Sequence, residues 1–141
     1  MFYLDTSILV AYYCPEALSK TVEAFLAAHD DLAVSPLVEL ELSSAVARKV
    51  RERGLESKDG TRIVSKFLSH LRNGFYASIP LETHHFRLAR DWIGQFKTPL
   101  RTFDALHLAV SSGEGATLVT SDRGLLKSAK TFSVDALLLG P

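Results

Sequence analysis

Residues 32–54 read LAVSPLVELELSSAVARKVRERG, a short apolar run followed by a long helical pattern. The first four residues have the length expected of a buried strand. Ser35 is expected to cap the helix that follows, Pro36 suits its first position, and Gly54 suits its end. The stretch therefore predicts one strand that leads directly into one helix, which ends at Arg53.

The same alternation extends along the rest of the chain. Further short apolar runs predict strands at Phe2–Leu4, Ala77–Ile79, Leu118–Thr120 and Val134–Leu138. Helical patterns cover Glu16–Ala28, Ser57–Arg72, Glu82–Phe96, a segment capped by Thr102 that runs to Val110, and a segment capped by Asp122 that runs to Lys130. Strands that alternate with helices predict an α/β fold with a parallel sheet covered on both faces. We expect a single domain over residues 1–141.

Composition excludes several classes of protein. Sixteen basic and sixteen acidic residues cancel, which is typical neither of a polybasic nucleic-acid binder nor of an acidic, disordered chain. The single cysteine, Cys14, has no partner for an internal disulfide, which fits a reducing compartment. No apolar run approaches the roughly 20 residues that cross a bilayer. We therefore expect a soluble, cytoplasmic protein without a membrane partner.

Four acidic residues are placed where their carboxylates can face one cleft: Asp5, Glu41, Asp104 and Asp122. Asp5 and Asp122 each follow a predicted strand, and ligands of an open parallel sheet bind beyond the carboxyl ends of its strands. Clustered carboxylates repel one another, so a fold that gathers them usually holds a divalent cation between them. Oxygen ligands favour Mg²⁺ or Mn²⁺ over zinc. The pattern predicts metal-dependent chemistry on phosphate.

Each acid also has a simpler interpretation. An Asp at the start of a helix is often a cap or a partner of the helix dipole, and this alternative applies to Asp104 and Asp122. It applies less to Asp5, because Thr6 and Ser7 are better caps and would leave the Asp5 carboxylate free. Glu41 lies well inside its helix, so its alternative is a solvated surface position.

Glu39 competes with Glu41 for the cleft. Residues two apart on a helix point about 200° away from each other, so only one of the two can face a given cleft. Glu41 shares a polar face with Arg48 and Arg51, whereas Glu39 falls on the mainly apolar side. We prefer Glu41 as the site residue.

Arginine residues lie near the acids in the sequence. Arg48 and Arg51 share the face of Glu41, and Arg101 and Arg123 flank the two late acids. Guanidinium groups near a metal site are suited to holding phosphate, which makes these four candidates for RNA phosphate contacts. The alternative for each is an ordinary solvated arginine.

The histidines give no catalytic pattern. None has a cysteine or a second histidine at the spacing of a helical metal site. We expect surface or helix-packing roles for His29, His70, His84, His85 and His107.

Four blocks of sequence resemble a known family. They are Tyr3-Leu4-Asp5-Thr6-Ser7, Ser35-Pro36-Leu37-Val38-Glu39-Leu40-Glu41-Leu42, Leu100-Arg101-Thr102-Phe103-Asp104-Ala105-Leu106-His107-Leu108-Ala109 and Leu118-Val119-Thr120-Ser121-Asp122. In this order and spacing they resemble PIN-domain proteins, and within that family the VapC-type toxins of toxin–antitoxin pairs. The resemblance implies a three-layer α/β/α fold with a central parallel sheet of four to five strands. It places Asp5, Glu41, Asp104 and Asp122 on the acidic positions of the family, and Thr6 and Thr120 on its small hydroxyl positions.

The resemblance also implies an activity. It points to a Mg²⁺- or Mn²⁺-dependent endoribonuclease that cleaves RNA phosphodiesters with a metal-activated water. A toxin of this type is expected to have a small VapB-like antitoxin as its partner and to form a homodimer. Two alternatives stay open, a stand-alone PIN-domain nuclease for RNA processing and a metal-binding assembly module without catalysis.

Overall fold

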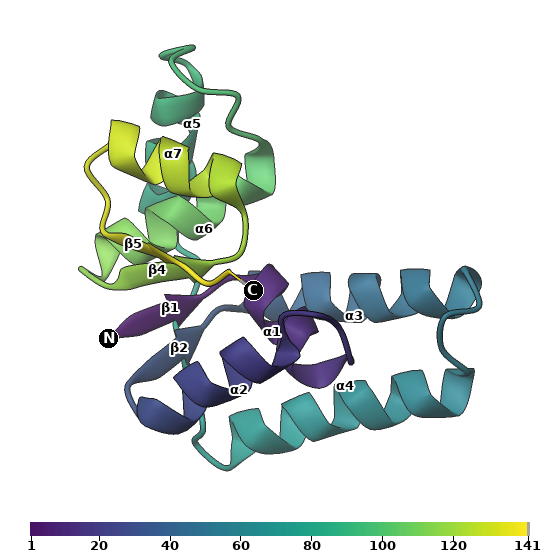
Figure 1. Cartoon of the computed structure of the whole chain (residues 1–141). Coiled ribbons are helices and arrows are strands. Elements are labelled where there is room, and N and C mark those ends of the chain that lie inside the picture. The colour runs from purple at the N-terminus through teal and green to yellow at the C-terminus, as the bar shows by residue number, and fades with distance from the viewer. Residues whose placement is uncertain (141) are drawn as a thin grey trace.

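The protein, as a computed structural model, is described over residues 1–140, and this part forms a five-stranded sheet with seven helices (Figure 1). The strands are β1 (Phe2–Leu4), β2 (Leu32–Val34), β3 (Ala77–Ser78), β4 (Thr117–Thr120) and β5 (Ala136–Leu138). The helices are α1 (Thr6–Tyr13), α2 (Ser19–Ala28), α3 (Pro36–Arg51), α4 (Ser57–Arg72), α5 (Thr83–Ile93), α6 (Thr102–Gly113) and α7 (Arg123–Thr131).

The sheet is parallel throughout, with the strand order β3-β2-β1-β4-β5. In the central strand, Phe2 lies opposite Leu32 on one side and Thr117 on the other. The carboxyl ends of β2, β1 and β4 therefore meet at one edge of the sheet. Asp5 follows β1 and Ser35 follows β2, so both residues lie at this edge.

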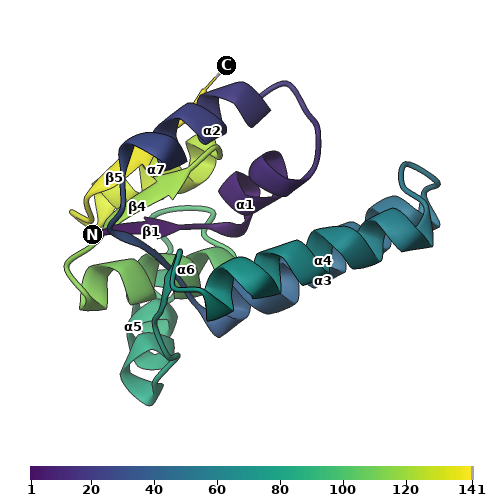
Figure 2. The ribbon, with the colours of Figure 1, turned by 90° about the horizontal axis from the view of Figure 1, so that it is seen from below.

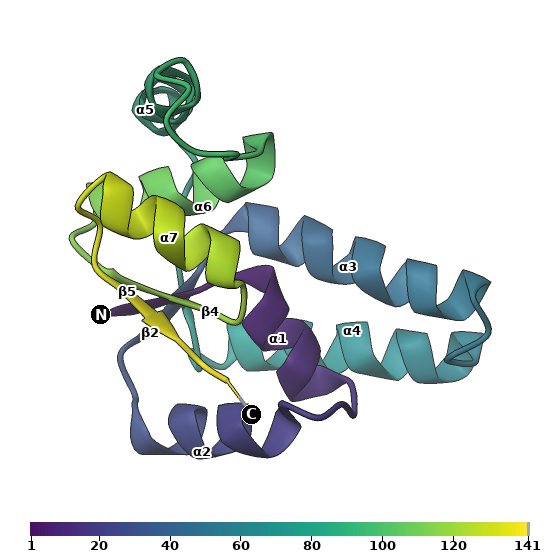
Figure 3. The same cartoon turned by 45° about the horizontal axis from the view of Figure 1, so that its top comes forward.

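Helices cover both faces of the sheet. Figure 1 shows α6 and α7 on one face and α2 on the other, and the tilted view of Figure 3 shows the same layers. Tyr3, Leu4, Leu118 and Val119 are completely buried, as expected for strands packed on both faces. These features confirm the predicted α/β/α fold, with five strands in the sheet.

Helices α3 and α4 form an antiparallel pair that extends away from the sheet (Figure 2). Gly60 lies where the two helices approach closely: a Cβ atom there would lie 3.1 Å from Val46 Cγ1 and 3.2 Å from Val50 Cγ2, so these valine side chains would have to shift by a few tenths of an ångström. The first turns of α3 lie near the sheet edge, whereas its last turns project outward. This helix therefore leads from the edge of the sheet to the outer end of the pair.

The structure corrects two of the predicted caps. Ser35 has the extended backbone of an N-cap residue, but its hydroxyl makes no cap hydrogen bond and instead pairs with the Tyr3 hydroxyl at 2.8 Å. Arg101, and not Thr102, is the N-cap residue of α6, and Thr102 is its first helical residue. Within residues 1–140, no helix is both long and apolar enough to cross a membrane.

Candidate metal centre

Asp5 is buried at the carboxyl end of β1, with 4% of its surface exposed. It is the N-cap residue of α1, because its Oδ1 atom accepts a hydrogen bond from the Ile8 amide at 3.3 Å. Ser7 Oγ donates to the same oxygen at 2.5 Å. The expectation that Thr6 and Ser7 would cap this helix is therefore wrong, since an aspartate that directly follows a strand is itself well placed to cap.

Burial has a clear electrostatic effect on Asp5. Removal from water raises the pKa of its carboxyl group above the usual value, and the hydrogen bonds from Ser7 and Thr120 oppose this effect only in part. Thr120 is itself completely buried, and its Oγ1 atom accepts a hydrogen bond from the Asp122 amide at 3.0 Å. Thr120 thus lies between two of the predicted acids, which agrees with its proposed supporting role.

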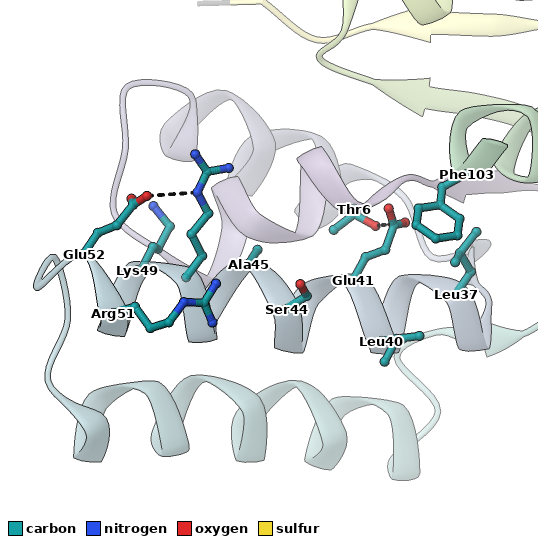
Figure 4. Close-up of a pocket in the computed structure, with 11 residues that line it drawn as sticks. Thr6, Leu37, Leu40, Glu41, Ser44, Ala45, Lys49, Arg51, Glu52 and Phe103 are labelled. Carbon is teal, nitrogen blue, oxygen red and sulfur yellow. Dashed lines mark hydrogen bonds and ion pairs between the residues drawn. The ribbon is translucent and has the colours of Figure 1, made fainter. Parts of the chain in front are cut away.

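Glu41 reaches toward the sheet edge from the second turn of α3. Its Oε1 atom accepts a hydrogen bond from Thr6 Oγ1 at 2.8 Å and another from His107 Nε2 (Figure 4 shows the Thr6 contact). Burial raises the pKa of Glu41, but the hydrogen bonds from His107 and Thr6 and the charge of His107 outweigh it, so the net pKa is lowered. Glu39 makes neither contact, as the helical-wheel argument predicted.

Asp104 lies in the first turn of α6 and is partly buried. Burial is the largest cause of its raised pKa, and the negative charges of Asp122, Asp5 and Glu41 raise the pKa further, while His107 opposes them. Asp104 is therefore close enough to all three other acids to be repelled by them. The four predicted acids share one electrostatic environment.

Asp122 is exposed and caps α7. Its Oδ1 atom accepts hydrogen bonds from the amides of Gly124 at 2.7 Å and Leu125 at 3.2 Å. The predicted cap is thus present, and it occupies one carboxylate oxygen. Asp122 also contributes to the repulsion on Asp104, so the cap does not remove its charge from the acidic cluster.

His107 is the site residue that the sequence reasoning missed. It is 2% exposed, its Nδ1 atom pairs with the Tyr3 hydroxyl at 2.8 Å, and its Nε2 atom bonds Glu41. His107 is therefore not a surface residue, and beyond the expected helix packing its ring makes two side-chain hydrogen bonds. The available signal was its spacing, because a residue three positions after Asp104 lies on the same face of a helix.

The donor chemistry of the cluster fits Mg²⁺ or Mn²⁺. Its side chains offer carboxylate oxygens. Burial raises the pKa of Asp5, and burial together with the charges of neighbouring carboxylates raises the pKa of Asp104; a cation would oppose both effects. Over residues 1–140, no group of three His, Cys, Asp or Glu side chains is arranged to coordinate one metal ion. Mg²⁺ usually keeps several waters and binds through one or two carboxylates, so this arrangement suits a largely hydrated ion.

A cavity of about 840 Å³ opens beside Glu41 (Figure 4). Its lining includes Arg48, Lys49 and Arg51, and the exposed aromatic ring of Phe103 lies at the Glu41 end. Arg48 Nε is 3.1 Å from Glu52 Oε1 in a solvent-exposed pair, which holds it only weakly. Two of the predicted arginines thus share a cavity with Glu41.

The other two predicted arginines occupy different positions. Arg101 is the exposed N-cap residue of α6, and Arg123 is the exposed first residue of α7. Neither lines the cavity beside Glu41. Each is instead near one acid in the sequence: Arg101 precedes Asp104 by three residues, and Arg123 directly follows Asp122.

Fold and site together define a three-layer α/β/α domain with an acidic cluster at the carboxyl edge of a parallel sheet. The PIN domain model matches residues 2–130, and the chain belongs to this family. No curated protein matches the chain in sequence.

Several solved structures share the fold. FitAcB from Neisseria gonorrhoeae is 18% identical with a TM-score of 0.71, covering 97% of this chain and 96% of its own. VapC20 from Mycobacterium tuberculosis, a Sarcin-Ricin loop cleaving toxin, is 17% identical with a TM-score of 0.72 and coverages of 91% and 95%. VapBC2 from Rickettsia felis, bound to a promoter DNA fragment, is 20% identical with a TM-score of 0.69 and coverages of 99% and 100%. At these identities, the similarity establishes the fold alone.

Proposed function

We propose that this protein is a Mg²⁺- or Mn²⁺-dependent endoribonuclease. The observation that supports this most strongly is geometric: Asp5 is buried directly after β1, and the next residue, Thr6, bonds Glu41 at 2.8 Å, so two of the acids meet at the sheet edge. The charges of Asp122, Asp5 and Glu41 all contribute to the raised pKa of Asp104, which agrees with this grouping. Carboxylates gathered at the carboxyl edge of a parallel sheet, one of them raised in pKa by the charges of the other three, favour the binding of a hydrated cation. Membership of the PIN domain family supports a nuclease activity for this site.

The four acids would hold the ion, and each has a distinct position. Asp5 and Asp104 are proposed as direct ligands, and Glu41 and Asp122 as direct or water-mediated ligands. When bound, the ion would lower the pKa of a water molecule and neutralise the charge that develops on the phosphate. Thr6 orients the Glu41 carboxylate through its 2.8 Å hydrogen bond.

Substrate binding is proposed to use the basic residues of the cavity. Arg48 lies seven residues after Glu41, which is about 10 Å along the helix axis, and Arg51 lies almost one turn further. Both are exposed, so an RNA backbone that extends from the acidic cluster along α3 can place phosphates on them. Arg101 and Arg123 are proposed to contact phosphates on the side of Asp104 and Asp122. The overall charge is zero, so binding depends on this local arrangement.

We further propose that the protein is the toxin of a toxin–antitoxin pair. The fold is shared with VapC20, a toxin, and with VapBC2 and FitAcB. A small VapB-like antitoxin would then be the protein partner, and the toxin would form a homodimer. We also propose that residues 1–141 form a single PIN domain, of which the family model matches residues 2–130.

Expression in a growing cell tests this role. The wild type is produced with and without a co-expressed antitoxin candidate from the neighbouring reading frame, and growth and RNA 5′ ends are measured. Growth arrest with new RNA ends, abolished by Asp5→Asn and relieved by the antitoxin, is the expected result. Metal-dependent cleavage in vitro without growth arrest would instead assign the protein to RNA processing. Absence of cleavage under both conditions would leave a non-catalytic assembly module.

A further inference from the structure

A chain of buried hydrogen bonds connects the two central strands to Glu41. Ser35 Oγ lies 2.8 Å from the Tyr3 hydroxyl, which lies 2.8 Å from His107 Nδ1, and His107 Nε2 bonds Glu41 Oε1. Ser35 and Tyr3 are completely buried, and His107 is 2% exposed. Tyr3 inside β1 and Ser35 directly after β2 are thus connected to a side chain of α3 through a side chain of α6.

The direction of these hydrogen bonds follows from the chemistry of the groups. A carboxylate oxygen can only accept, so His107 Nε2 donates in the contact with Glu41. With a neutral imidazole, Nδ1 accepts from the Tyr3 hydroxyl and Ser35 donates to the Tyr3 oxygen. With a protonated imidazole, Nδ1 donates to Tyr3 and Tyr3 donates to Ser35. In both states each of these side chains has a partner with a compatible role, and Nε2 donates to Glu41.

The two oxygens of Glu41 are used differently. Thr6 Oγ1 and His107 Nε2 both donate to Oε1, and no residue in the described part of the chain hydrogen-bonds Oε2. Oε1 is therefore fixed by the protein, and Oε2 is the oxygen that stays available to an ion or to a water bound to it. Two donors on one oxygen define the rotation of the carboxylate as well as its position.

We propose that His107, held by Tyr3, is a positioning residue that orients the Glu41 carboxylate so that Oε2 faces the metal ion. The inference rests on the proposed metal-dependent function and deepens it. A histidine that served packing alone would not need a charged acceptor on one ring nitrogen and a buried hydroxyl on the other. In metal sites, groups that orient a ligand in this way typically change affinity or activity by about 10–100-fold when they are removed.

Mn²⁺ binding to the RNA-free protein tests the proposal without relying on activity. Calorimetric titration compares the wild type with His107→Leu, which removes both ring nitrogens, and with His107→Gln, whose amide can still donate toward Glu41. We expect His107→Leu to weaken Mn²⁺ binding by about 10–100-fold and His107→Gln to restore most of the affinity. Tyr3→Phe keeps the packing volume and removes only the hydroxyl, so we expect a smaller loss in the same direction.

Thermal unfolding of each metal-free variant separates positioning from folding. If His107→Leu does not fold, Tyr3→Phe decides the outcome. A role in stability alone predicts a lower melting temperature for the variants with unchanged Mn²⁺ affinity, and that result would overturn the proposal.

Glu41→Gln distinguishes failure of this inference from failure of the proposed function. If Glu41→Gln weakens Mn²⁺ binding while the folded His107 and Tyr3 variants bind like the wild type, only the positioning role is overturned. If the wild type binds no Mn²⁺, or if Glu41→Gln binds as tightly as the wild type, the role of Glu41 in the metal centre is overturned and the positioning role with it.

Discussion

His107 donates a hydrogen bond from Nε2 to the Oε1 atom of Glu41, and this contact joins α6 to α3 across the acidic site. Asp5 and Asp122 cap helices, whereas Glu41 and Asp104 do not. Its lowered pKa contrasts with the raised pKa values of Asp5 and Asp104. The protein therefore stabilises the ionised form of Glu41 and destabilises the ionised forms of Asp5 and Asp104. A cation would stabilise the latter pair most.

Asp5 has two roles, and two substitutions separate them. Asn is a good N-cap residue, so Asp5→Asn should retain the cap of α1 and lose only the charge, whereas Asp5→Ala loses both. We expect Asp5→Ala to lower the free energy of unfolding by about 1 kcal/mol relative to Asp5→Asn. Chemical denaturation in EDTA measures this difference. Equal stability of the two variants would mean that the Asp5 cap contributes nothing.

Asp104 should reduce the stability of the metal-free protein. Burial and three neighbouring carboxylates raise its pKa, so a neutral Asn of the same shape removes a repulsive charge. We expect Asp104→Asn to raise the melting temperature in EDTA by about 3 °C, and saturating Mn²⁺ to cancel this advantage because it stabilises the wild type. Differential scanning calorimetry measures both effects. A lower melting temperature for Asp104→Asn in EDTA would contradict the proposed repulsion.

The raised pKa values of Asp5 and Asp104 also predict a pH dependence. A carboxyl group whose folded pKa is raised contributes stability below its unfolded pKa and loses it as the pH rises through the folded pKa. In EDTA, the melting temperature of the wild type should therefore fall relative to that of Asp104→Asn as the pH rises from about 4 to about 8. Comparison with the variant removes the contribution of other titrating groups. A gap that stayed constant over this range, or that Mg²⁺ did not close, would argue against the linkage.

Arg48 should act on RNA binding and leave metal binding unchanged. It lines the cavity beside Glu41, and its exposed pair with Glu52 leaves it able to contact phosphate. Arg48→Gln should weaken binding to single-stranded RNA and reduce the salt dependence of the logarithm of affinity by about 0.7. Arg62→Gln is a matched control, because Arg62 is an exposed arginine of α4 that does not line this cavity. Equal effects of the two substitutions would exclude a specific role for Arg48.

The fold was predictable because its signals are local. Each strand is a short apolar run, and the helix Ser57–Arg72 has the predicted ends. The helix α1 (Thr6–Tyr13) was missed, because after Ser7 its residues are all apolar and show no helical alternation. The other differences occur at the ends of elements, where α2 begins at Ser19 rather than Glu16 and α6 continues to Gly113 rather than ending at Val110. Helix ends depend on which neighbouring group satisfies the last backbone atoms, and several residues compete for that role.

The acids of the site were predictable, but the contacts that orient them were not. Asp5 and Asp122 follow strands that end at one edge, a relationship that topology alone provides. The Tyr3–His107 hydrogen bond joins residues 104 positions apart in the sequence, and no local pattern specifies it. Ser35 has the sequence context of a cap, yet its hydroxyl bonds Tyr3 because the adjacent central strand brings that group within reach. These side-chain contacts could therefore be identified only from the structure.

The most direct measurement is the rate of RNA cleavage as a function of Mg²⁺ concentration for the wild type, Asp5→Asn and Asp104→Asn, with each protein shown to be folded. We predict that the wild-type rate rises with Mg²⁺ and vanishes in EDTA, and that both folded variants are slower by at least about 100-fold. Cleavage that persists in EDTA, or a folded Asp104→Asn variant that cleaves at the wild-type rate, would contradict a metal-dependent nuclease built on these carboxylates.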